Sequence, residues 1–375
     1  MKNSKKRSTL ITAASLIVLF ALTILLEQLI PTTSSWAMLL TVIKKSAVYA
    51  LVAVSMNLLN GFTGLFSLGQ AGFMLLGAYA YGIFTIPVES RMSVYQYYEG
   101  GLIQFTIPWP VALLLAGIVA AIFAFLIGLP VLRLKSDYLA IATLGFAEII
   151  RAIFQWDAFG PITNGSNVLK DYVRFNSFKI GDVSLSTFAP VAIVVVCIAI
   201  IVLLINSSYG RAFKAIREDE IAAEAMGINL FKHKQLSFCT SSFFAGIGGA
   251  LLAMFAGTVQ AGQFKVAMTY ELLLIVVIGG IGSVSGSVLA SFLFIGCSEW
   301  WLRGLDMGTF LGINAPTLFR NGFRLVVFSV IIMIFVLFFR KGIMGTMELP
   351  EWLRHIKGKI QNKIASRKAK KEAAK

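Results

Sequence analysis

One polar island interrupts a hydrophobic chain at residues 207–234, Ser207-Ser-Tyr-Gly-Arg-Ala-Phe-Lys-Ala-Ile-Arg-Glu-Asp-Glu-Ile-Ala-Ala-Glu-Ala-Met-Gly-Ile-Asn-Leu-Phe-Lys-His-Lys234. Its alanine- and glutamate-rich middle favours a helix. The apolar side chains expected on one face of that helix are Ile216, Ile221, Ala225 and Met226. Gly227 is the expected C-cap, because glycine adopts the left-handed conformation at little cost.

The charge of the island indicates which side of a membrane it occupies. Its basic residues are Arg211, Lys214, Arg217, Lys232 and Lys234. Because cytoplasmic loops are rich in Lys and Arg, we expect the island on the cytoplasmic side. It is then either an ordinary loop or a docking surface for a soluble partner that supplies energy.

The composition is that of an all-α, polytopic integral membrane protein. The 375-residue chain is 57 % hydrophobic and 14 % charged, with a mean hydropathy of +0.81. Runs of about 20 apolar residues recur, and such runs span a bilayer as helices. Basic segments at residues 1–9 and 341–375 are expected to lie in the cytoplasm, which explains the charge of +15 better than nucleic-acid binding does. A transmembrane domain is therefore expected over residues 10–340.

About ten transmembrane helices are expected. The crossings are residues 10–30, 46–60, 69–87, 108–130, 136–155, 187–206, 235–258, two within 268–303, and 322–340. Nine crossings would leave the basic tail outside, whereas ten return it to the cytoplasm. This topology places Lys44 and Lys45 in an outer loop, and leaves two outer segments, 88–107 and 156–186, long enough to present a surface. The tail is either disordered or a basic amphipathic helix lying on anionic lipid.

Two glycine-rich breaks interrupt the expected helices, one in each half of the chain. The first is Gly61-Phe-Thr-Gly-Leu-Phe-Ser-Leu-Gly-Gln70 and the second is Gly279-Gly-Ile-Gly-Ser-Val-Ser-Gly-Ser287. Paired breaks of this kind mark discontinuous helices near a translocation path, or else tight loops and close helix packing. The candidate path residues are Asn57, Asn60, Thr63, Ser67, Gln70, Gly279, Gly280 and Gly282. Their polar groups either suit a polar solute or satisfy one another.

The remaining ionisable residues argue against an enzyme. Glu148 and Arg151 are three residues apart, so they can form an intramembrane ion pair, either beside the path or as a structural brace. Residues 64–69 have the glycine spacing of a phosphate-binding loop but lack its lysine, which excludes ATP binding. No metal cluster and no nucleophile–base motif is found, so we expect no catalytic residue, no metal and no cofactor.

Five motifs occur together between residues 46 and 346. They are Gly61-Phe-Thr-Gly-Leu-Phe-Ser-Leu-Gly-Gln-Ala-Gly-Phe73, Ser136-Asp-Tyr-Leu-Ala-Ile-Ala-Thr-Leu-Gly-Phe-Ala-Glu-Ile-Ile-Arg151, the island from Gly210 to Asn229, Glu271-Leu-Leu-Leu-Ile-Val-Val-Ile-Gly-Gly-Ile-Gly-Ser283 and Phe339-Arg-Lys-Gly-Ile-Met-Gly345. Together they resemble the LivM-type permease subunits of branched-chain amino acid ABC importers. Three features depart from that family: Gln70 stands where histidine is common, the basic tail is longer, and the ABC-permease signature is degenerate, with no Ile-x-Leu-Pro after Gly227.

The resemblance implies a multi-pass permease of a bacterial cell membrane, with both termini in the cytoplasm. It implies a second, homologous permease, two cytoplasmic ABC ATPases and an extracytoplasmic solute-binding protein as partners. It also implies that residues 207–234 are the coupling loop. The candidate ATPase-coupling residues are Arg211, Arg217, Glu220, Ala222, Glu224 and Gly227. Because the chain has no phosphate loop, any ATP-driven role requires such partners.

Three functional hypotheses follow. The first is the permease subunit of an ATP-driven importer for leucine, isoleucine and valine. The second keeps the same machine with another cargo, such as urea, short amides, nucleosides or other amino acids. The third is an ion-coupled secondary transporter or a channel, for which Glu148 and Glu271 are the candidate intramembrane acids.

Overall fold

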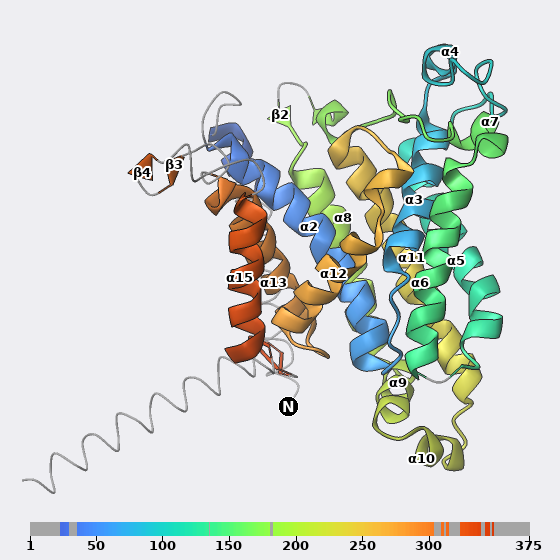
Figure 1. Ribbon diagram of the computed structural model, residues 1–375, viewed down its shortest axis with the longest axis vertical. Helices are drawn as coiled ribbons and strands as arrows, with labels where there is room; N and C mark the ends of the chain where they lie inside the picture. Colours follow the sequence, from blue (N-terminus) through green and yellow to red (C-terminus); the bar gives the residue numbers. More distant parts are fainter. Residues whose placement is uncertain are drawn as a thin grey trace, which may run out of the picture.

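The computed structural model describes residues 23–29, 36–134, 136–180, 183–303, 309–310, 313–314, 323–338, 342–345 and 347–348. Within these ranges the regular secondary structure is helical, apart from two-stranded β pairs (Figure 1). Most of the expected crossing at 10–30 lies outside the described residues. So do the N-terminal segment 1–9 and residues 349–375 of the basic tail.

Long apolar helices make up the body of the protein (Figure 1). They are α2 (Ala37–Asn57), α3 (Gln70–Thr85), α5 (Trp109–Val131), α6 (Ser136–Gln155), α8 (Phe188–Asn206), α11 (Leu230–Ala256), α12 (Val266–Gly279), α13 (Val284–Ile295) and α15 (Phe323–Phe338). α2 continues into the π-helical turn η1 (Leu58–Phe62), and α13 continues into a second one, η6 (Gly296–Trp301).

Five of the described helices are long and apolar enough to cross a membrane. α3 and the segment Val88–Val94, which contains η2 (Val88–Ser90) and α4 (Arg91–Val94), form a pair bent by 102° that adds a sixth candidate. α12 and α13 are separate helices on either side of residues 280–283, as the two-crossing interpretation of 268–303 expects. α12 has only 14 residues, fewer than the about 20 that a full crossing needs. The chain is thus a multi-pass helical membrane protein, and the ten-crossing topology stays a prediction.

The expected outer-loop position of Lys44 and Lys45 is wrong. Both residues lie inside α2, which begins at Ala37 rather than at residue 46. The Nζ of Lys44 donates to Ser186 Oγ at 2.6 Å, and the Nζ of Lys45 lies 2.6 Å from Glu299 Oε1. Glu299 compensates the charge of Lys45. Glu27, which accepts a hydrogen bond from Ser186 Oγ, acts on the charge of Lys44, so the helix can run through both lysines.

The core forms where α3, α5 and α11 pack with their backbones in contact. A Cβ at Gly77 would lie 2.0 Å from Gly246 O, and one at Gly249 would lie 1.9 Å from Met74 O. A Cβ at Gly246 would in turn lie 2.7 Å from Ala116 O. Small residues permit this close approach in a membrane, where packing rather than water exclusion holds helices together.

The two segments expected to form an outer surface pack together at one end of the molecule, termed here the α4–α7 end (Figure 1). Here α7 (Gly160–Thr163) and η3 (Asp157–Phe159) meet the loop after α4. Leu102 N donates to Pro161 O at 2.8 Å, and Tyr95 Oη donates to Ile162 O at 2.9 Å. The buried Arg91 guanidinium donates to backbone carbonyl groups of both flanking segments, including Phe105 O at 2.8 Å.

Short elements complete the described structure. They are η4 (Phe175–Ser177), η5 (Ala261–Gln263), β1 (Lys179–Ile180), β2 (Val183–Ser184), β3 (Thr309–Phe310) and β4 (Ile313–Asn314). β1 pairs with β2 and β3 pairs with β4, both antiparallel. The opposite end of the molecule, termed the α9–α10 end, carries the polar island (Figure 1).

Candidate functional site

The polar island folds as two short helices, α9 (Ser208–Glu218) and α10 (Glu220–Ala225). Asp219 separates them in an extended conformation, with φ −159°. Its Oδ1 accepts hydrogen bonds from Ile221 N at 2.9 Å and Ala222 N at 3.0 Å. An N-cap at this position ends one helix and begins the next, because its side chain satisfies the first free N–H groups of α10.

The single apolar face expected for the island is therefore wrong. Ile216 and Phe213 are the apolar residues on the buried face of α9. On α10, Ile221 and Met226 point away from the protein and are 82 % and 84 % exposed. Two functions are thus divided between the helices: α9 packs onto the membrane domain, and α10 presents apolar side chains to its surroundings.

The expected C-cap at Gly227 is confirmed. Gly227 has φ +82°, in the left-handed region that favours glycine. Its N–H donates to Glu224 O at 2.9 Å, and Ile228 N donates to Ala223 O at 3.1 Å, which is a Schellman motif. A salt bridge of 2.6 Å between Lys234 Nζ and Glu220 Oε2 joins α10 to α11. These contacts fix α10 relative to the helix that follows it.

The two glycine-rich breaks meet in space, and Asn57 joins them. Gly282 N donates to Asn57 Oδ1 at 2.8 Å. Asn57 Nδ2 donates to Ser283 O at 2.9 Å and to Ser287 Oγ at 2.8 Å. The whole Asn57 side chain is buried. A single amide thus connects the end of α2 to both sides of the break between α12 and α13.

Glycine is required where the breaks touch. A Cβ at Gly61 would lie 1.9 Å from Asn57 Oδ1 and 2.6 Å from Gly282 N. On the other side, Gly280 and Gly282 have φ values of +119° and +92°, which non-glycine residues adopt only with strain. The contact therefore explains the glycines of both breaks by close approach and by backbone conformation.

Arg217, at the end of α9, lies at this contact. Its Nη1 donates to Gly61 O at 2.7 Å. A Cβ added to Gly282 would lie 3.0 Å from the same Nη1. A Cβ added to Gly64 would lie 2.9 Å from Arg217 Cγ. One side chain of the island thus touches both breaks. We call the cluster of Asn57, Gly61, Gly64, Gly280, Gly282 and Arg217 the break junction.

The other polar residues of the first break are paired within the protein. Ser67 N donates to Asn60 Oδ1 at 3.1 Å, and Thr63 Oγ1 lies 2.6 Å from Ser237 Oγ. Gln70 Nε2 donates to Ser241 Oγ at 3.2 Å. Of the two alternatives left open by the sequence, these bonds favour mutual satisfaction. A role of these residues in the path stays a prediction.

A segment that follows α15 also reaches the break between α12 and α13. Met344 N donates to Gly279 O at 3.2 Å, and the Glu348 carboxylate accepts from Val284 N at 2.8 Å and Ser285 N at 3.0 Å. Glu348 therefore caps α13. Sequence reasoning missed this role, although an acidic residue beginning a basic tail is a usable signal.

Glu148 and Arg151 form the ion pair that their spacing predicts, with Arg151 Nη2 2.5 Å from Glu148 Oε2. Arg151 Nη1 also donates to Gln155 Oε1 at 3.1 Å, so the pair extends along α6. Whether it borders the path stays a prediction. Among the described residues, no three His, Cys, Asp or Glu side chains are grouped to hold a metal ion.

Helices broken at a shared junction, with a short helical projection touching that junction, are typical of a membrane transport subunit. Residues 38–339 match the family described as the branched-chain amino acid transport system permease component. The chain belongs to this family and is a non-catalytic subunit of an ABC transporter.

Curated relatives agree with this assignment. The high-affinity branched-chain amino acid transport system permease protein LivM of Salmonella typhimurium is 33 % identical over 274 residues, which are 66 % of this chain and 60 % of the relative. The probable LivM of Methanocaldococcus jannaschii is 25 % identical over 66 % of this chain and 76 % of its own. The nucleoside ABC transporter permease protein NupC of Lactococcus lactis is 23 % identical over 62 % of this chain and 71 % of its own. The alignment thus spans about 60 % of the Salmonella LivM length. No solved structure matches.

Proposed function

We propose that this chain is a permease subunit of an ATP-driven importer for leucine, isoleucine and valine. It would form the translocation path together with a second, homologous permease. Two cytoplasmic ATPases would drive the transporter, with the α9–α10 end as this chain's docking surface for an ATPase, and a solute-binding protein would deliver substrate at the α4–α7 end. The observation that carries the proposal is the contact of Arg217 with both helix breaks.

The proposed ATPase-docking element is α10. Its exposed Ile221 and Met226 stand beside the carboxylates of Glu220 and Glu224. Apolar anchors surrounded by charges are the usual composition of a protein–protein contact. The placement in the cytoplasm rests on the basic residues of the island.

The proposed coupling runs from α10 to the membrane helices in one chain of contacts. Closure of the ATPases would displace α10, and α9 would move with it as a rigid body. Arg217 would carry this displacement to Gly61 O, and Asn57 would transmit it to the break between α12 and α13. Each of the helices α2, α12 and α13 has one of its two ends at this junction. A single displacement there would therefore reorient all three.

Uptake into proteoliposomes tests the proposed function. The complete transporter is expected to take up labelled L-leucine only when ATP and the solute-binding protein are both present. Uptake that is unchanged after both are omitted would instead indicate a secondary transporter or a channel. The NupC relative makes nucleosides the competing cargo. Calorimetry of leucine and of nucleosides with the solute-binding protein separates these two cargos.

The first prediction concerns α10. Met226→Glu introduces a charge on a side chain that is 84 % exposed, so the protein itself should fold normally. If Met226 occupies an apolar pocket of the ATPase, the glutamate places a carboxylate in that pocket and the apolar contact is lost. We therefore expect the affinity for the ATPase to fall about tenfold. Co-purification and equilibrium binding of the ATPase to the reconstituted permease measure the effect.

Met92→Glu is the matched control, because Met92 is 69 % exposed at the α4–α7 end. This variant should bind the ATPase with the wild-type affinity. Charge reversal at Glu224 should also weaken ATPase binding. Reversal at Glu220 is less specific, since it also breaks the salt bridge to Lys234. ATPase binding that survives Met226→Glu and the Glu224 reversal would show that the docking surface lies elsewhere.

A further inference from the structure

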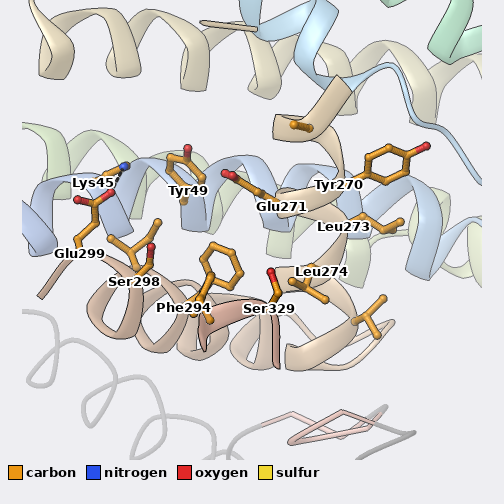
Figure 2. Close-up of a pocket in the computed structure, with 14 residues that line it drawn as sticks. Lys45, Tyr49, Tyr270, Glu271, Leu273, Leu274, Phe294, Ser298, Glu299 and Ser329 are labelled. Atoms are coloured by element: carbon orange, nitrogen blue, oxygen red, sulfur yellow. Dashed lines mark hydrogen bonds and ion pairs between the residues drawn. The ribbon is translucent and has the colours of Figure 1, made fainter. Parts of the chain in front are cut away.

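A cavity of about 760 Å³ lies between α2, α12, α13 with η6, and α15 (Figure 2). Its volume lies within the range of small-molecule sites. One side of it is polar and is lined by Lys45, Tyr49, Glu271 and Glu299. The rest of the lining is mostly apolar and includes Leu274, Val277, Phe294 and Phe328, with Ser298 and Ser329 near Phe294 and Leu274 (Figure 2). A cavity with one charged and one apolar side fits an amphipathic solute.

The charges of the polar side are not balanced within the described residues. Lys45 and Glu299 compensate each other, with 2.6 Å between Nζ and Oε1. Glu271 stands beside Tyr49 and faces the cavity (Figure 2). No hydrogen bond or salt bridge links Glu271 to any residue in the described ranges. The lining therefore carries a net negative charge. The Glu271 carboxylate interacts with the Lys45 charge only beyond salt-bridge distance, so it can still accept a cationic group.

The apolar side is preorganised. The rings of Phe294 and Phe328 pack edge to face, with 4.8 Å between their centroids. Leu274 is one helical turn from Glu271, so the aliphatic surface begins next to the carboxylate. A ligand held at Glu271 by a cationic group would thus place a short aliphatic chain against Leu274 and the two rings.

We propose that this cavity binds an α-amino acid with an aliphatic side chain during transport, a proposal that rests on the proposed function. The ammonium group of the ligand pairs with the Glu271 carboxylate. The ligand carboxylate lies towards Lys45 Nζ and the Tyr49 hydroxyl, and the aliphatic side chain fills the space at Leu274 and Phe294. A lipid chain or an apolar helix of the second permease lying here would bury the exposed Glu271 carboxylate without a hydrogen-bond donor, which is costly.

The position of the cavity connects it to the break junction. Along α2, Lys45 lies 12 residues before Asn57, or about 18 Å at the rise of an α-helix. Along α12, Glu271 precedes Gly280, which is also part of the junction. On α13, Glu299 lies at the end of the helix that begins after the second break. Each charged residue of the cavity thus stands on a helix that has one end at the junction. A displacement of the break junction would therefore change the shape of the cavity.

The test uses the complete transporter in proteoliposomes, with saturating solute-binding protein and labelled L-leucine. Glu271→Gln keeps the shape of the side chain and removes its charge. We expect it to lower the rate of L-leucine uptake about tenfold, as for the loss of a charge-assisted hydrogen bond. ATP hydrolysis stimulated by the binding protein should stay at the wild-type level, since docking is unaffected. Glu271→Asp, which keeps the carboxylate, should restore most of the uptake.

A second pair of variants tests the apolar side independently of Glu271. Leu274→Trp fills the cavity and should abolish L-leucine uptake while stimulated ATP hydrolysis persists. Leu293→Trp makes the same substitution on α13 at a residue that is 54 % exposed and does not line the cavity, and it should transport normally.

The outcomes distinguish the two proposals. If the wild-type transporter takes up no leucine, the proposed function fails. If the wild type transports leucine and both Glu271→Gln and Leu274→Trp do so at the same rate, the cavity is not the amino acid site, and its occupant is lipid or the second permease. If Glu271→Gln also loses stimulated ATP hydrolysis, its effect on uptake is not specific to the cavity. The proposal then stands if Leu274→Trp loses uptake while Leu293→Trp keeps it, and fails if the two variants transport equally.

Discussion

Arg217→Ala is expected to lower ATP-dependent uptake roughly 10- to 100-fold, the range of a typical coupling free energy between two sites. The substitution removes the hydrogen bond to Gly61 O and the packing against Gly64. α9 should remain in place, because Phe213 and Ile216 stay buried beneath it. ATPase binding should therefore persist while its displacement no longer reaches the membrane helices. Parallel assays of L-leucine uptake and of ATP hydrolysis on the same proteoliposomes measure the effect.

The ratio of ATP hydrolysed to solute transported separates uncoupling from misfolding. In Arg217→Ala this ratio should rise, because hydrolysis continues without transport, whereas a misfolded protein would lose both activities. Lys232→Ala removes an equal charge from an exposed side chain in the first turn of α11, outside the candidate coupling residues, and should leave the ratio unchanged. Arg217→Lys should recover part of the uptake, since an ammonium can reach one carbonyl group but lacks the second arm of the guanidinium. An unchanged ratio in Arg217→Ala would exclude this residue from coupling.

The helices of this fold were predictable from local sequence. α5, α8 and α11 lie close to the expected crossings, because an apolar run in lipid must satisfy its own backbone and so becomes helical. The glycine-rich breaks were also predictable, since clustered glycines disfavour a continuous helix. In both cases the residues that decide the outcome are neighbours in sequence.

Long-range pairing was not predictable in the same way. Lys44 and Lys45 resemble loop residues as long as their partners Ser186 and Glu299 are unknown. Similarly, nothing near Asn57 in sequence indicates that its amide binds Gly282, 225 positions away. The division of the island at Asp219 is different, because an aspartate preceding an alanine-rich segment is a recognised N-cap signal. That signal was available and was outweighed by the helix propensity of the whole segment.

The joining of the two halves at the break junction makes the stability of the protein sensitive to substitution of Gly61. Gly61→Ala would place a methyl group 1.9 Å from Asn57 Oδ1 and 2.6 Å from Gly282 N. Asn57 cannot move aside without losing its hydrogen bonds to Gly282, Ser283 and Ser287. The steric overlap with Gly282 N and the loss of the hydrogen bonds of the buried Asn57 amide are together expected to lower the free energy of unfolding by about 3 kcal/mol or more.

Thermal unfolding of the detergent-solubilised protein, monitored by size-exclusion chromatography, measures this loss of stability. Gly145→Ala is the matched control, because Gly145 lies within α6 and a Cβ there would have no neighbour within 4 Å. The control should unfold at the wild-type temperature or slightly above it, since alanine is the better helix former by about 1 kcal/mol. If Gly61→Ala also unfolds at the wild-type temperature, the two breaks do not touch as described. The link from Arg217 to α12 and α13 would then be lost as well, because it passes through the same contact of Gly61 with Gly282.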